Sequence, residues 1–164
     1  MTSDIKKVKS LFEESGFIDV NYEDGTNSNS PLMYACKYGN IDIVKFLVLE
    51  KNADVDCRNN KGDNVLIVSS HCGNLPIFRF LIEEGEVDIN STNIDGTTPL
   101  MIASHWGYME IVEYIIENTN VELEIKNNKG LTFFDYLNEE YYHRIKKLLR
   151  DIEERKKMVK PNRR

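Results

Sequence analysis

The sequence predicts an all-α solenoid: three full helix-turn-helix repeats joined by hairpin loops, with a capping unit at each end. The first support is a 34-residue period that recurs in independent positions: Gly39, Gly73 and Gly107; Gly62, Gly96 and Gly130; Leu32, Leu66 and Leu100. The second is that short apolar stripes at helical spacing alternate with single glycines. A stack of repeats has one long surface and no central cleft, so this architecture favours binding over catalysis.

The clearest repeat covers residues 93–126, NIDGTTPLMIASHWGYMEIVEYIIENTNVELEIK. Its Asp-Gly pair at 95–96 predicts a turn, and the next signal is a helix start, with Thr98 as N-cap and Pro99 in the first helical position. Gly107 ends this short helix, and the second helix carries an apolar stripe of Ile111, Val112, Ile115 and Ile116. Helices this short are marginal alone, so each needs a neighbouring repeat to cover its stripe.

The two preceding repeats, 25–58 and 59–92, keep the same pattern with local departures. Asn64 stands where Thr-Pro is expected, and it can still cap a helix. The entry loop at residues 25–29 is about three residues longer than its counterparts. We therefore expect the same helix pair in both units, preceded by a wider loop in the first.

Both ends of the chain predict capping units. Residues 3–24 indicate a polar helix plus a loop, and residues 127–154 indicate a last repeat whose first helix turns Phe133, Phe134 and Leu137 inward. Tyr141 stands where the glycine between the helices is expected. Terminal repeats are normally atypical because one of their faces meets water. Residues 155–164 are expected to form a basic, flexible tail.

This pattern resembles the ankyrin repeat, whose signature is a Gly-x-Thr-Pro-Leu turn, a glycine between two helices and an apolar second helix. The residues that carry the resemblance are Gly96, Thr98, Pro99, Leu100, Ala103, Gly107, Ile111, Val112, Ile115 and Ile116. It implies a module that binds a partner protein through its concave helix face and hairpin tips. The units here have 34 residues instead of the family's usual 33, so we expect a bulged loop near residues 52, 86 and 120.

Composition and charge narrow the function further. The net charge is −6, and because residues 155–164 hold six basic groups and no acid, the other 154 residues carry −12. An acidic body disfavours nonspecific nucleic-acid binding. No apolar run approaches a membrane span, no secretion signal is recognised, and the three cysteines are expected as free thiols. We expect a cytoplasmic monomer, with the tail as a candidate nuclear import signal, an acidic-partner contact or a solubilising extension.

The resemblance places two rows of residues on the concave face, just before the glycine between the helices. One row is Tyr38, Cys72 and Trp106, and aromatic rings of this kind commonly anchor protein interfaces. His71 and His105 share the neighbouring slot. Adding residues from the tips, the predicted protein-binding surface comprises Tyr38, Asn60, Asp63, His71, Ile94, His105 and Trp106, with no catalytic residue, cofactor or metal.

Two alternative functions use the same residues or the tail. A metal-binding or hydrolytic protein would combine His71 and His105 with a cysteine. Against it, adjacent helical side chains such as His71 and Cys72 diverge by about 100 degrees, and stacked repeats lie about 10 Å apart. An adaptor recruited to nucleic acid or a membrane would use the basic tail, and the acidic body weighs against this role.

Overall fold

The computed structural model describes residues 3–15 and 18–159, which form helices, turns and loops without a strand. The elements are α1 (Ser3–Glu14), α2 (Pro31–Lys37), α3 (Ile41–Lys45), a π-helical turn η1 (Phe46–Glu50), α4 (Val65–Cys72), α5 (Leu75–Glu83), α6 (Pro99–Trp106), α7 (Met109–Asn118), a 3-10 turn η2 (Phe133–Tyr136) and α8 (Glu139–Val159). The predicted all-α class is confirmed.

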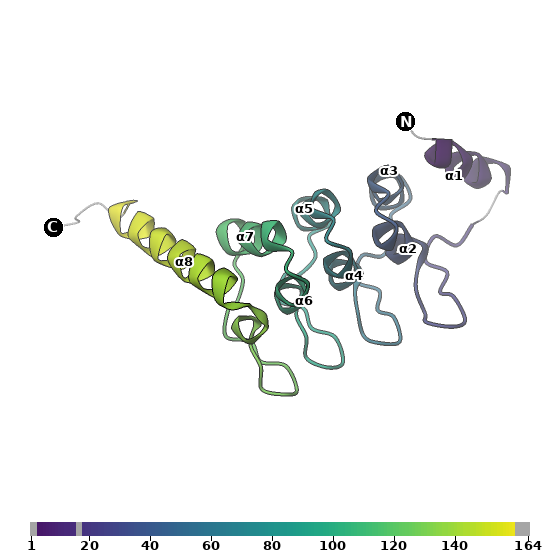
Figure 1. Ribbon diagram of the computed structural model, residues 1–164. Coiled ribbons are helices and arrows are strands. Elements are labelled where there is room, and N and C mark those ends of the chain that lie inside the picture. Colours follow the sequence, from purple (N-terminus) through teal and green to yellow (C-terminus); the bar gives the residue numbers. More distant parts are fainter. Residues whose placement is uncertain (1–2, 16–17, 160–164) are drawn as a thin grey trace.

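The helices form two rows, with the hairpin tips extending from one side of the stack (Figure 1). The first helices of the repeats, α2, α4 and α6, make one row, and the second helices, α3, α5 and α7, make the other. Contacts run mainly between neighbours in the same row, and η2 continues the first row after α6. At the N-terminal end, α1 packs on α3, so it occupies the place of a second helix. The first row therefore begins at α2.

A polar N-cap recurs at the start of each first helix. The side chains of Ser30, Asn64 and Thr98 each accept a hydrogen bond from the backbone amide three residues later. Thr132 stands at the fourth such position and forms a reciprocal capping box with Asp135. The caps predicted at Asn64 and Thr98 are confirmed, and they explain why helices of seven or eight residues begin at these points.

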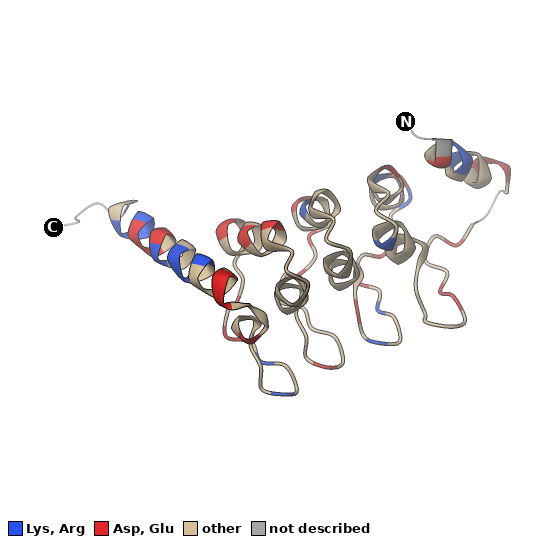
Figure 2. Ribbon diagram, viewed as in Figure 1, with Lys and Arg blue, Asp and Glu red and all other residues tan. Residues whose placement is uncertain are grey.

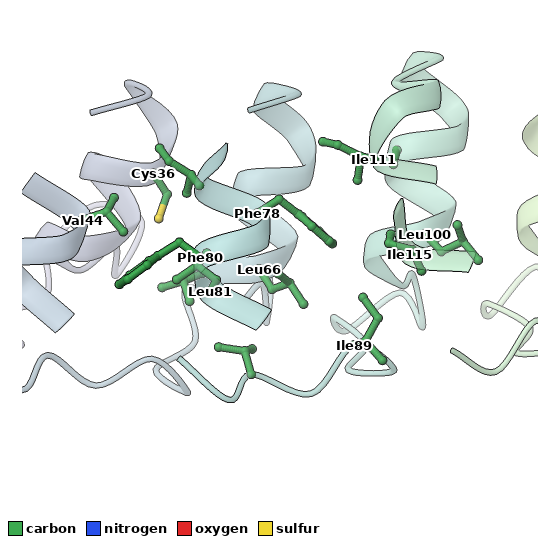
Figure 3. Packing of buried hydrophobic residues seen from close by; sticks show 14 of the residues in the cluster. Cys36, Val44, Leu66, Phe78, Phe80, Leu81, Ile89, Leu100, Ile111 and Ile115 are labelled. Atoms are coloured by element: carbon green, nitrogen blue, oxygen red, sulfur yellow. The ribbon is translucent and has the colours of Figure 1, made fainter. Parts of the chain in front are cut away.

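The core is built from slots that repeat every 34 residues. Leu32, Leu66 and Leu100 are all buried at one slot, as are Val44, Phe78 and Val112 at another. Figure 3 shows side chains of both rows meeting between neighbouring repeats, with Leu66 and Phe78 in the middle of the stack. Each apolar stripe is thus covered by the next repeat, which supplies the stability that a short helix lacks.

The hairpin tips are joined to one another by hydrogen bonds. The backbone amides of Asn60, Ile94 and Asn128 each donate to a carbonyl of the preceding tip, at 2.9 to 3.1 Å. Within a tip, the side chain of Asn59, Asn93 or Asn127 accepts two backbone amides. The tips are therefore braced, so their outer side chains are presented from a fixed backbone.

The extra residue of the 34-residue unit is accommodated in two ways. Asn52 and Glu86 both take a left-handed backbone conformation with φ of 53°, which confirms the expected bulge after the second helix in two units. In the first of them the helix also ends in the π-helical turn η1. The expectation is wrong at Asn120, which has no such conformation because α7 continues to Asn118 and runs into extended backbone at Thr119.

The C-terminal unit differs from the prediction. Its first helix is reduced to the 3-10 turn η2, and Leu137 lies beyond that turn in extended backbone. The side chain of Asn138 accepts the amide of Tyr141 at 2.8 Å, so α8 starts early and Tyr141 lies inside it instead of between two helices. Without a glycine at that position, no left-handed turn separates two helices of normal length.

Helix α8 extends well past the stack. Ile145 is fully buried, Ile152 is half-buried, and residues 153–158 are exposed. The predicted tail begins inside this helix, which continues to Val159. The last part of that tail, residues 160–164, lies outside the described residues.

The wider first loop is organised by one carboxylate. Asp24 accepts hydrogen bonds from the hydroxyl and amide of Thr26, the amides of Asn27 and Asn29, and the hydroxyl of Tyr34. These donors, led by the Thr26 hydroxyl, hold the pKa of Asp24 well below its usual range. A charged carboxylate therefore does here what an asparagine does in the later tips.

Substitution of a core leucine should test the register. Leu66→Ala should lower the free energy of unfolding by about 2–5 kcal/mol, because it leaves a cavity at a fully buried position shared by neighbouring repeats. Leu49→Ala is the matched control, since Leu49 is 57% exposed and should change stability by about 0.5 kcal/mol or less. Urea unfolding followed by circular dichroism measures both, and equal losses would contradict the assigned packing.

Two glycines separate backbone strain from crowding. Gly73 and Gly130 both have positive φ, of 66° and 77°, but a Cβ on Gly73 would lie 2.6 Å from the Tyr108 ring, whereas one on Gly130 would meet nothing within 4 Å. Gly130→Ala should cost about 1 kcal/mol for the left-handed conformation alone. Gly73→Ala should cost clearly more, because Tyr108 must also move. Thermal unfolding of the pair checks the order, and a milder effect at Gly73 would refute this packing.

Acid should weaken the first loop through Asp24. Because its folded pKa is lowered, its stabilising contribution is complete above its unfolded pKa, near 3.9, and is lost as pH falls through the folded value. We expect Asp24→Asn to be less stable at pH 7 and to lose less stability than the wild type between pH 5 and pH 3. Asp95→Asn, at a tip carboxylate that accepts no hydrogen bond among the described residues, should keep the wild-type pH slope in chemical unfolding.

Candidate functional site

Two hollows lie side by side between the hairpin tips and the first helices. The larger, about 410 Å³, is lined by Asn27, Asn29, Lys37, Asn59, Asn60, Lys61, Asp63, Val68, His71, Cys72 and Trp106. The smaller, about 290 Å³, is lined by Lys61, Asp63, His71, Asn93, Asp95, Thr97, Met101, Ile102, His105, Trp106 and Tyr136. They share four residues, Lys61, Asp63, His71 and Trp106. We call the two hollows together the Trp106 groove.

Trp106 stands at the junction of the two hollows. It is the last residue of α6, directly before the left-handed Gly107, and its side chain is 56% exposed. The ring of His105 meets it edge to face, with 5.3 Å between the ring centroids, and Tyr136 meets His105 from the other side at 5.6 Å. Tryptophan in such a place combines a large rigid area with an N–H donor, as interface anchors do.

Five of the seven predicted site residues lie in this groove: Asn60, Asp63, His71, His105 and Trp106. Asp63 is only 4% exposed, and its carboxylate accepts a hydrogen bond from the side chain of Asn93 at 2.9 Å. It therefore braces the tips from inside the groove wall. The outward positions in the groove belong to the remaining four.

The two other predicted residues lie apart. Tyr38 is 75% exposed and borders a separate, mainly apolar hollow of about 500 Å³ between α1 and α2. Ile94 is 66% exposed at its tip, where its side chain covers Gly62 of the preceding tip. The aromatic row read from the sequence is thus divided between two places on the surface.

The structure also brings in residues that the prediction omitted. Lys37 and Lys61 line the groove, and Tyr136 closes its C-terminal end, where its hydroxyl accepts a hydrogen bond from Asn127. Lys37 stands exactly 34 residues before His71, and Tyr136 stands 34 after Ile102. Extending the repeat register to these slots would have found both.

Neither the histidines nor the cysteines show activation. Crowding around His71 lowers its pKa mainly by desolvation, with Lys61 and His105 adding to the effect and Asp63 opposing it. Burial raises the pKa of the Cys72 thiol, which disfavours the reactive thiolate. Over the described part of the chain, no group of three or more histidine, cysteine, aspartate or glutamate side chains has the geometry to hold a metal ion. His71 and Cys72 border the same hollow without forming such a set.

The described helices contain none with both the length and the apolar character needed to cross a membrane. A family model described as ankyrin repeats (3 copies) matches residues 2–59 and 32–128, so the matches together span most of the chain and include all the residues of the Trp106 groove except Tyr136. This agrees with the stacked helix pairs, the recurring caps and the braced tips. The chain belongs to the ankyrin repeat family, whose repeats are generally protein–protein interaction modules.

Proposed function

We propose that this protein is a non-enzymatic interaction module that holds a partner protein across the Trp106 groove. The observation that carries the proposal is the half-exposed Trp106 at the junction of two hollows, on a backbone braced by its neighbours. Interfaces derive much of their affinity from such aromatic anchors in water-excluding surroundings. His71 and His105 flank the anchor, and Asn60 offers an amide from the tip.

Tyr38 and Ile94 extend the proposed surface beyond the groove. Both are large, exposed and apolar in part, and each lies on an element that also contributes to the groove wall or its tips. Asp63 contributes indirectly, since its bond to Asn93 holds two tips together. A partner that spans the tips and the first helices would meet all of these residues except Asp63 directly.

The alternative with His71, His105 and a cysteine as a metal-binding or hydrolytic site is less well supported. A nucleophile needs an adjacent base and a lowered pKa, and burial shifts the pKa of Cys72 in the opposite direction. Recruitment to nucleic acid or a membrane through the basic tail has no supporting contact in the described part of α8, where residues 153–158 are exposed.

We propose that the protein acts as a monomer in a reducing compartment, the cytoplasm or nucleus. Its cysteines, Cys36, Cys57 and Cys72, are all free. Free thiols persist where the cell keeps them reduced. Light scattering of the purified chain would measure its oligomeric state directly.

Site-specific photocrosslinking in the cell of origin tests the proposed surface. A benzophenone amino acid at Asn60, on the groove, should capture a distinct partner protein on irradiation. The same group at Glu117, an exposed position on α7, is the matched control and should not capture it. Mass spectrometry identifies the product, and capture of the same protein from Glu117 alone would place the binding surface on the second helices.

The captured partner then allows a measurement of affinity. Trp106→Ala should weaken binding by more than about 1 kcal/mol if the ring is the anchor. Because Trp106 is already half-exposed, the variant should keep the wild-type circular dichroism spectrum. Unchanged affinity in a folded variant lacking both the Trp106 and Tyr38 rings would exclude this surface as the binding site.

A further inference from the structure

A row of nitrogen bases follows the Trp106 groove. Lys37, His71 and His105 occupy one slot in three successive repeats, in the last turn of α2, α4 and α6. Lys37 and His71 line the larger hollow, and His71 and His105 line the smaller one. Lys61, from the hairpin tip, lines both. Among the ion pairs of the described residues, none involves Lys37 or Lys61, so both ammonium groups are available to a ligand.

The carboxylates of this acidic chain lie mostly elsewhere. The first helices α2, α4 and α6 carry none, whereas every second helix carries at least one, and α7 has three: Glu110, Glu113 and Glu117. Figure 2 shows this contrast, with the first-helix row almost free of red and the second-helix row marked by it. In the groove, Asp63 is buried against Asn93, which leaves Asp95 at the tip. The groove is therefore biased towards positive charge within a chain whose net charge is −6.

An apolar platform lies within the same groove. Trp106 borders both hollows, with Val68 in the larger and Met101 and Ile102 in the smaller. An indole surrounded by basic groups suits a ligand that pairs carboxylates with one large apolar side chain, because each kind of group then meets its complement.

We propose that the Trp106 groove binds an acidic polypeptide segment with a large apolar side chain placed on Trp106. This inference rests on the proposed function and adds the chemistry of the partner. Carboxylates of the segment pair with Lys37 and Lys61, while its backbone meets the amide-rich tips. Charge complementarity of this kind sets specificity and speeds association.

Polypeptide fits these observations better than nucleic acid. A nucleic acid needs many cations along its phosphates, and its affinity rises with each phosphate that is neutralised. The groove offers two lysines, and the glutamates of α7 add a negative field nearby. An acidic segment with spaced carboxylates demands fewer cations and uses the apolar platform.

Selection from a displayed library of random 12-residue peptides tests the inference on the full-length chain. Enriched peptides should be net negative and should contain an aromatic or large aliphatic residue. A synthetic copy of the most enriched peptide, followed by fluorescence polarisation, should bind the Lys37→Gln, Lys61→Gln double variant about tenfold more weakly, as expected when partly desolvated charge pairs are lost. Its affinity for the wild type should also fall as salt is raised.

A matched double variant controls for net charge. Lys147→Gln with Lys156→Gln removes the same two charges from exposed positions on α8 and should bind the peptide as the wild type does. Equal weakening by both double variants, or by neither, would overturn the proposed pairing. Enriched peptides that are neutral or basic but lose binding in Trp106→Ala would overturn the acidic partner and leave the groove as the site.

Other outcomes reject the groove itself or its ligand class. Enriched peptides that bind Trp106→Ala and the wild type equally, or a library without any enrichment, would contradict both this inference and the proposed function. A fluorescent polyuridine RNA probe completes the comparison. If it bound more tightly than the selected peptide and lost binding in the Lys37, Lys61 double variant, the groove would be a nucleic-acid site instead.

Discussion

Each short helix in this chain can bury its apolar stripe only against the helix of a neighbouring unit, and the other features of the structure depend on that contact. Helices of seven to ten residues are marginal in water. Here the same slots meet along the whole stack, so Leu66 in the central repeat lies between neighbours of the same kind on both sides. Stability is therefore shared across the interfaces between units, and no repeat is independent of the next.

The polar framework of the tips follows from the same stacking distance. Loop backbone groups need hydrogen-bond partners when they leave water. Because neighbouring repeats are held in register, the amide of Ile94 reaches the carbonyl of Lys61, and the amide of Asn128 reaches that of Asp95. Asn59, Asn93 and Asn127 then close each tip from within. The tips are long loops, yet the stack gives them the order needed to present side chains.

Packing leaves two rows of the first helices free to vary, and the candidate site lies there. The buried slot holds leucine in all three repeats, at Leu32, Leu66 and Leu100. The outward slots change identity along the stack: lysine is followed by two histidines in one row, and the other holds Tyr38, Cys72 and Trp106. A position that faces solvent has little effect on stability, so its residue can be chosen for contact with a partner. The stack thus supplies the rigid support, and these rows supply the chemistry.

The sequence by itself determined the period, the helix starts at Asn64 and Thr98, and the inward faces of the helices. These are local or periodic signals, set by caps, glycines and apolar spacing within one unit. Only the tertiary structure decided which side chains from different repeats share a hollow: it joined Trp106 to His71 and Lys61, placed Tyr38 beside α1, and buried Asp63 against Asn93. It also shortened the first helix of the last unit, because Asn138 caps α8 early and no glycine follows. Such features depend on how neighbouring units meet in space, and a 34-residue pattern specifies which residues are equivalent without specifying which of them touch.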